Sequence, residues 1–206
     1  REAAQAAAPC AIAQSGKRVL LIDTDLRRPR IHRAFGIPSG GGVTSVIVGE
    51  LSFDDAVIAT DVPNLDVIPS GPIPPNPSEL FHSQRFAELI ETAKARYDRV
   101  LFDSPPLNVV TDAAVIAPQV QAALIVIKAE HTTRDALKSV LRQMSDVGAN
   151  VVGGVLNDID PKRGSYGGAG NYYYYYRNEG YYAADDDPDD DDEPSPRPRD
   201  AAPPPS

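Results

Sequence analysis

The first 158 residues hold five short apolar runs, separated by stretches with helical patterns. The runs are KRVLLID at 17–23, NLDVIPSG at 64–71, RVLFDSPP at 99–106, AALIVIKAE at 122–130 and NVVGGVLND at 150–158. Short runs with two apolar faces are typical of strands in a parallel sheet that helices cover on both sides. Strands that alternate with helices at this spacing predict a mostly parallel, doubly wound α/β sheet.

The last part of the chain has a different composition. Residues 164–206 carry 10 acidic and 3 basic side chains, and glycine, tyrosine, aspartate and proline dominate the segment. Such a segment has too few aliphatic side chains to form a core. We therefore expect one folded domain at 1–163 and a disordered tail at 164–206, with a tyrosine cluster at 166–182 and an acidic, proline-rich end.

Charge and cysteine content exclude several classes of function. Residues 1–163 carry 19 acidic and 17 basic side chains, so the folded part has no basic surface for nucleic acid, and the acidic tail would repel it. The single Cys10 excludes an internal disulfide and a cysteine-rich zinc site, which fits a reducing cytoplasm. No stretch approaches the ~20 apolar residues that span a bilayer. Any membrane association is expected through a partner or a further segment.

Three of the predicted strands end in polar side chains. The first ends in Asp23 and Asp25, the third in Asp103, and the fifth in Asn157 and Asp158. Ligands of open α/β sheets bind beyond the carboxyl ends of the strands, and Mg²⁺ prefers one or two carboxylates together with phosphate oxygens. A single aspartate at a strand end is more typical of a turn or a helix cap. The three strand ends together predict a phosphate and metal site.

Several segments resemble one protein family. VLLIDTDLRRPR resembles the Walker A′ motif, and VLFDSPP the Walker B motif, of the bacterial tyrosine kinases, the cytoplasmic ATPase half of polysaccharide co-polymerases. GPIPPNPSELF, TDAAVIAPQVQAALIVIKAEHTTRDAL and VVGGVLNDID are similar to that family in order and spacing. The resemblance covers residues 10 to about 182 and implies a P-loop fold of the partition-ATPase type. It also implies an ATP-dependent protein-tyrosine autokinase that regulates capsular or exopolysaccharide biosynthesis and export.

The resemblance implies a role for each residue at the strand ends, with ATP and Mg²⁺ as cofactors. Asp103 and Asp23 would bind the metal. Asp23 and Asp25 would be catalytic, one of them accepting the proton of the tyrosine hydroxyl. ATP would be contacted by Asn157, Asp158 and Arg27, although a solvated loop is an equally good interpretation of Arg27.

One motif that the resemblance requires is absent from the sequence. P-loop enzymes bind phosphates with a glycine-rich turn that ends in Gly-Lys-Ser/Thr at a helix N-terminus. By alignment of the first helix, we expect this loop at or before Arg1. Either the sequence is a fragment of a competent kinase or the gene has decayed, and a fragment is the simpler explanation because the later motifs are intact. This chain alone is expected to be inactive.

The resemblance also gives the tail a function. A run of five tyrosines cannot turn a single face to a core in a helix or a strand. The resemblance implies that a neighbouring subunit of a homo-oligomer phosphorylates them, and each phosphate adds about −1.5 to −2 charges that would push subunits apart. The alternative is an unmodified low-complexity tail. The expected phosphorylation sites are Tyr172, Tyr173, Tyr174, Tyr175, Tyr176, Tyr181 and Tyr182.

Partners and alternatives follow from the same family. It implies a membrane activator, the polysaccharide co-polymerase segment, on the same or a separate chain, and a cytoplasmic location at the inner face of the plasma membrane. A partition-type ATPase of the Min and Par kind shares the fold, but the DSPP sequence and the tyrosine cluster argue against it. A non-catalytic interaction module that has lost its phosphate-binding loop is the other alternative.

Overall fold

A computed structural model describes residues 2–38, 40–74, 76–107 and 109–159. The predicted tail at 164–206, with all seven expected phosphorylation sites, lies outside the described residues, so the predicted division at residue 163 stays a prediction. The helices are α1 (Glu2–Gln14), α2 (Ile31–Ala34), α3 (Val43–Val48), α4 (Phe53–Ala56), α5 (Pro77–Leu80), α6 (Gln84–Arg96), α7 (Asp112–Ile116), the 3-10 turn η1 (Ala117–Gln119) and α8 (Arg134–Asp146). The strands are β1 (Val19–Asp23), β2 (Ile58–Ala59), β3 (Leu65–Ile68), β4 (Arg99–Asp103), β5 (Ala123–Lys128) and β6 (Val151–Asn157).

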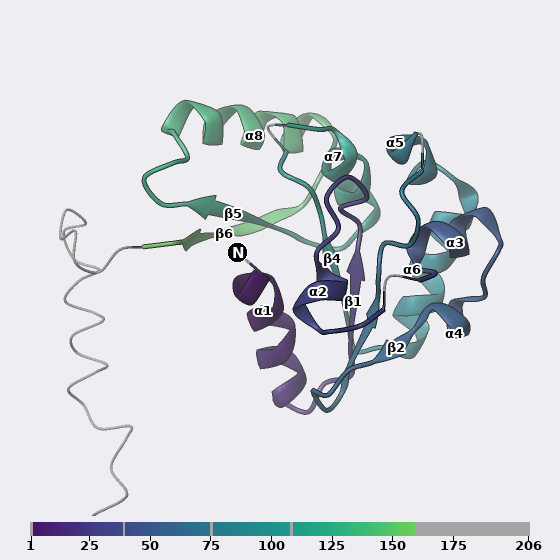
Figure 1. The fold of residues 1–206 in the computed structure, drawn as a ribbon. Coiled ribbons are helices and arrows are strands. Elements are labelled where there is room, and N and C mark those ends of the chain that lie inside the picture. Colours follow the sequence, from purple (N-terminus) through teal and green to yellow (C-terminus); the bar gives the residue numbers. More distant parts are fainter. Residues whose placement is uncertain (1, 39, 75, 108, 160–206) are drawn as a thin grey trace, which may run out of the picture. The chain divides into compact units, whose positions relative to one another are not determined.

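The described strands confirm an α/β fold with mostly parallel pairing (Figure 1). Four of them form a sheet in the order β2-β3-β1-β4, in which β1 runs parallel to both of its neighbours. β5 and β6 form a separate parallel pair. β2 is an antiparallel edge strand, because α4 ends at Ala56 and Ile58 pairs with Val67.

The central strand β1 explains why helices lie on both faces of the sheet. All five of its residues are buried, and successive side chains of a strand point to opposite faces. Leu20 and Ile22 belong to one apolar cluster, which includes Phe86 of α6. Leu21 belongs to the other, which includes Ala13 of α1. This burial fixes the carboxyl end of β1, which bears the predicted site.

Among the described strands, β4 and β5 do not pair, in contrast to the continuous sheet that the sequence suggested. A cavity of about 720 Å³ is lined by both strands, including Val100 and Phe102 of β4 and Leu124 and Val126 of β5. Leu124 and Val126 are 61% and 66% exposed. Their apolar side chains gave the expected strand pattern, but apolar character alone does not specify which neighbour a strand pairs with.

A close backbone contact next to α3 leads to a stability prediction. A Cβ atom at Gly42 would lie 2.1 Å from the carbonyl oxygen of Pro69 and 2.4 Å from the backbone nitrogen of Gly71. We expect Gly42→Ala to lower the free energy of unfolding by about 2–3 kcal/mol, because two backbone segments must move apart. Gly40→Ala is the matched control, since no described atom lies within 4 Å of its Cβ position. Urea titrations of the two variants check this, and equal stabilities would contradict it.

Candidate active site

Asp23, the last residue of β1, is fully buried and organises the loop that follows it. Its Oδ1 accepts a hydrogen bond from the backbone N–H of Asp25 at 3.2 Å, and its Oδ2 accepts from the N–H groups of Arg30 and Ile31, each at 3.2 Å. Burial raises the pKa of Asp23 to about 7, opposed by the hydrogen bond from Ile31 and reinforced by the charge of Asp103. Asp23 is therefore a carboxyl group that can exchange a proton near neutral pH.

Asp25 is the more accessible of the two aspartates that follow the strand. It is half-buried, and its Oδ1 accepts hydrogen bonds from the backbone N–H groups of Arg27 at 3.3 Å and Arg28 at 3.0 Å. Between these residues Leu26 is fully buried in the apolar cluster beneath the loop. The two carboxylates thus bind backbone N–H groups of the loop at residues 24–30 and of Ile31, the first residue of α2. Asp23 binds them from inside and Asp25 from the rim of the loop.

Asp103 ends the neighbouring strand β4 and stands beside Asp23. The two residues are register partners in the parallel pair β1–β4. Thr24, which follows β1, links the ends of the two strands. Its N–H and its hydroxyl both donate to the backbone oxygen of Asp103, at 2.9 and 2.7 Å. The structure therefore brings together two of the predicted strand ends.

Asn157 and Asp158 lie at the end of β6, which belongs to the two-stranded sheet. Asn157 is the register partner of Lys128 on β5, and its side-chain oxygen accepts from the N–H of Asp158 at 2.9 Å. Asp158 adopts a left-handed backbone conformation with φ of 62° and forms an ion pair with Lys128 at 3.2 Å. The strand pairing thus places these residues beside Lys128. Their contact with ATP stays a prediction.

Arg27 makes a contact that the sequence did not indicate. Its Nε donates to Oδ2 of Asp112 at 2.9 Å, and its Nη2 lies 3.4 Å from Oδ1 of the same carboxylate. Asp112, the first residue of α7, is fully buried, and it also accepts a short hydrogen bond from the hydroxyl of Ser78. Ser78 lies within α5, and the cap of the next helix α6 is Ser83, which accepts a hydrogen bond from the N–H of Phe86.

The residues at the strand ends fit a magnesium ion better than a metal bound by protein ligands alone. No group of three or more histidine, cysteine, aspartate or glutamate side chains that could hold a metal occurs among the described residues. Asp23 and Asp103 supply two neighbouring carboxylates, and the charge of Asp103 already raises the pKa of Asp23. A cation would relieve that repulsion, and Mg²⁺ is usually held by one or two carboxylates plus phosphates.

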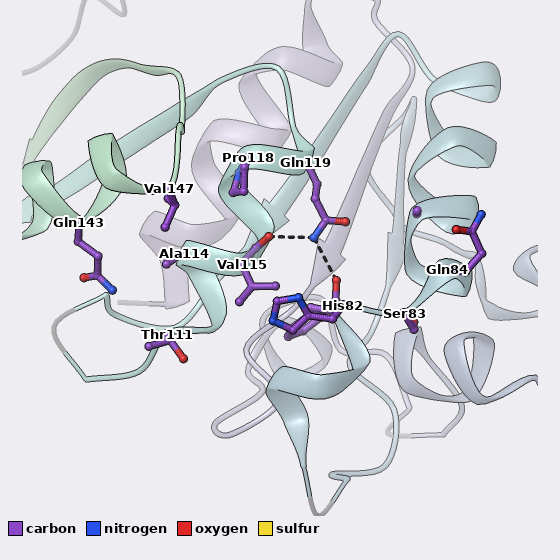
Figure 2. Close-up of a pocket in the computed structure, with 12 residues that line it drawn as sticks. His82, Ser83, Gln84, Thr111, Ala114, Val115, Pro118, Gln119, Gln143 and Val147 are labelled. Carbon is purple, nitrogen blue, oxygen red and sulfur yellow. Dashed lines mark hydrogen bonds between the residues drawn. The ribbon is translucent and has the colours of Figure 1, made fainter.

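A second hollow lies beside α7 and is lined by residues other than the aspartates. It has a volume of about 600 Å³ and is lined by residues of α7, α8 and the α5–α6 turn (Figure 2). On its wall the side-chain amide of Gln119 donates to the backbone oxygens of Val115 at 2.8 Å and Phe81 at 3.0 Å. Gln119 thereby ties the end of α7 to the segment that follows α5.

Comparisons with known proteins identify the family of the chain. The AAA domain family model matches residues 4–153. CapB of Staphylococcus aureus, named as a putative tyrosine-protein kinase, is 38% identical over 155 residues, which are 75% of this chain and 68% of CapB. The chain belongs to the bacterial tyrosine-protein kinases. The tyrosine-protein kinase wzc of Salmonella typhi is also 38% identical, over 78% of this chain and 22% of wzc.

Solved structures support both the family and the fold. The crystal structure of the chimerical protein CapA2B2 is similar with a TM-score of 0.73 and 37% identity, over 75% of this chain and 69% of that one. MinD of Pyrococcus horikoshii, complexed with Mg-ADP, has a TM-score of 0.62 and 21% identity, over 78% of this chain and 69% of that one. That likeness shows a shared P-loop fold alone, so the partition-type alternative is not favoured over the tyrosine-kinase family.

The chain covers different shares of these relatives. This chain of the tyrosine-kinase family spans about two thirds of CapB but only about a fifth of wzc. Among the helices of the described residues, none has the length and apolar character needed to cross a bilayer.

Proposed function

We propose that this chain is the ATP-dependent catalytic domain of a protein-tyrosine autokinase that regulates capsular or exopolysaccharide biosynthesis and export. The observation that carries the proposal is the pairing of Asp23 with Asp103 at adjoining strand ends, with Asp25 on the loop between β1 and α2. The tyrosine-protein kinases to which the chain is 38% identical support the choice of reaction.

Within this proposal the three aspartates have different tasks. Asp25 is half-buried and can accept the proton of an incoming tyrosine hydroxyl, because it reaches the surface of the loop while its Oδ1 is held by two backbone N–H groups. Asp103 and Asp23 would hold Mg²⁺, which when bound neutralises charge on the phosphates of ATP. Asp23 has the further task of holding the loop through three backbone N–H groups.

The remaining proposed contacts to ATP come from the end of β6 and from Arg27. Asn157 and Asp158 lie at a strand end, which is where nucleotides bind in sheets of this class. Arg27 donates to Asp112 through Nε and Nη2, and its Nη1 takes no part in these two hydrogen bonds. Arg27 can therefore contact a phosphate only through the remaining donors of its guanidinium group.

The proposed protein substrate is the tyrosine cluster of the chain's own tail, presented to a neighbouring subunit of a homo-oligomer. The composition of the tail predicts a segment with no core of its own, and tyrosines on such a segment would be accessible to another subunit's aspartates without a change in the folded domain. Phosphates added beside the acidic end would increase repulsion between subunits. We further propose a membrane activator segment of the co-polymerase type as a partner, and a place at the cytoplasmic face of the membrane.

A mixing experiment tests the proposal on the complete gene product, because the present sequence holds no Gly-Lys-Ser/Thr run. One variant has phenylalanine at the seven proposed phosphorylation sites and at Tyr166, and keeps its aspartates. The other carries Asp25→Asn and keeps its tyrosines. With Mg²⁺-ATP, we expect the second variant to gain phosphotyrosine only when the first is present. Tryptic peptides that span Tyr172 to Tyr182, analysed by mass spectrometry, locate the phosphates.

The outcomes separate the parts of the proposal. If the intact protein is labelled but the mixture is not, transfer between subunits is wrong. If neither is labelled, the kinase activity itself is wrong, and the non-catalytic interaction module becomes the better account.

A further inference from the structure

Asp112 forms a three-residue node with Arg27 and Ser78, here called the Asp112 node. Arg27 comes from the loop after β1, Ser78 from α5, and Asp112 from the start of α7. The loop after β1 lies at the same end of the four-stranded sheet as α5 and α7 (Figure 1). The node therefore joins three segments that are far apart in the sequence beside the candidate site.

The negative charge of Asp112 fixes the orientation of the Arg27 side chain in the node. A fully buried carboxylate is costly unless it is paired and hydrogen-bonded, and Asp112 has both a guanidinium and a hydroxyl as partners. Burial raises the pKa of Asp112, but the hydrogen bonds from Arg27 and Ser78 and the charge of Arg27 outweigh it, so the pKa lies below its ordinary value. The carboxylate is ionised at neutral pH and holds Arg27 in one orientation.

Arg27 connects this node to the candidate catalytic carboxylate. Its side chain is bound to Asp112, while its backbone N–H donates to Oδ1 of Asp25. Building on the proposed kinase function, we propose that Asp112 is a positioning residue, which fixes the loop after β1 and thereby orients the Asp25 carboxylate toward the incoming tyrosine hydroxyl.

The other contacts of α7 and α5 support a positioning role. Gln119 ties the end of α7 to the backbone of Phe81, just beyond α5. The helices that bear Ser78 and Asp112 are therefore linked to each other by a contact that does not involve the loop. A loop that is bound only by its own aspartates could move as a unit, whereas a contact to a separate rigid element fixes its place relative to the sheet.

The test compares Asp112→Asn with Asp66→Asn in the complete gene product. The first substitution keeps the shape of the side chain and removes the charge that binds Arg27. Asp66 on β3 is the matched control, because its Oδ2 accepts a hydrogen bond from the Tyr97 hydroxyl at 2.8 Å, a bond that does not involve the loop after β1. Asp112→Asn weakens the bonds from Arg27 and Ser78, and Asp66→Asn weakens the bond from Tyr97, so both variants are expected to lose some thermal stability.

Two measurements distinguish positioning from stability alone. Hydrogen exchange of the Arg27 and Arg28 amides, which Asp25 binds, is expected to quicken about tenfold in Asp112→Asn and to be unchanged in Asp66→Asn. For phosphotransfer, assayed well below each melting temperature, we expect kcat to fall about 10- to 100-fold in Asp112→Asn while KM for ATP changes less than about threefold.

Each result bears on one of the two proposals. Unchanged exchange at Arg27 and Arg28, or a wild-type kcat in folded Asp112→Asn, overturns the positioning role. A wild-type protein that transfers no phosphate overturns the proposed kinase function instead, and with it the catalytic purpose of the positioning. The exchange measurement still decides in that case whether Asp112 orders the loop.

Discussion

Replacing Asp25 with asparagine is expected to lower kcat for tyrosine phosphorylation by about 10²- to 10⁴-fold, the range typical of a lost general base. The amide side chain keeps one oxygen for the N–H groups of Arg27 and Arg28, so the loop keeps its hydrogen bonds. It cannot accept the proton of the tyrosine hydroxyl, because an amide is not basic at neutral pH. The loss is therefore expected in kcat, with little change in KM for ATP.

The control for this prediction is an aspartate outside the candidate site. Asp54 on α4 forms an exposed ion pair with Arg96 on α6, away from the strand ends. Asp54→Asn should keep the wild-type kcat in the same phosphotyrosine assay. If Asp25→Asn also keeps it, the proton goes elsewhere, and Asp23, with its pKa of about 7, becomes the candidate.

The central part of the fold could be predicted from the sequence because its signals are local. KRVLLID and RVLFD are apolar on both faces, which is typical of a buried parallel strand. The carboxylates that end them could then be placed at one edge of the sheet. In the structure Asp23 and Asp103 are register partners at the ends of two strands of equal length, which brings the two predicted metal ligands together.

The Asp112 node could not be predicted because it depends on contacts between distant segments. A serine before a helical pattern is typical of a helix cap, and both Ser78 and Ser83 stand in such a place. The turn at residues 81–83 divides the pattern, and Ser83 is the cap of α6. The hydroxyl of Ser78 is then available to Asp112, which lies 34 residues away. Asp112 itself lies within TDAAV, a segment noted for its family resemblance, and nothing in that segment indicates that its carboxylate is fully buried.

The pairing partners of β5 and β6 could not be predicted from the sequence pattern either. β5 and β6 have the apolar residues of inner strands, yet Val152 and Val155 of β6 are 59% and 46% exposed. Periodicity predicts that a strand exists, whereas its neighbours depend on the rest of the sheet. For this reason the apolar pattern of β6 could not place Asn157 relative to the ends of β1 and β4.

The stability of the folded domain is expected to fall as pH rises from about 4 to about 7, because of Asp23. The pKa of Asp23 is about 7 in the folded protein, whereas the ordinary value, which applies to the unfolded chain, is 3.8. Below pH 3.8 both states carry the proton. Between the two values the folded state keeps a proton that the unfolded chain has lost, so raising the pH favours unfolding. A pKa difference of this size between the two states corresponds to roughly 4 kcal/mol.

Urea titrations at several pH values, on wild type and two variants, check this prediction. Asp23→Asn cannot ionise, so its free energy of unfolding should lack this fall, although it loses one acceptor for the N–H groups of the loop. Asp103→Asn should end the fall at a lower pH, because it removes the like charge beside Asp23 while burial, the larger cause, remains. Parallel pH profiles for wild type and Asp23→Asn would mean that Asp23 ionises like an exposed carboxylate. It could then not serve as a proton acceptor poised near neutral pH, and of the two aspartates proposed as catalytic only Asp25 would be left as the base.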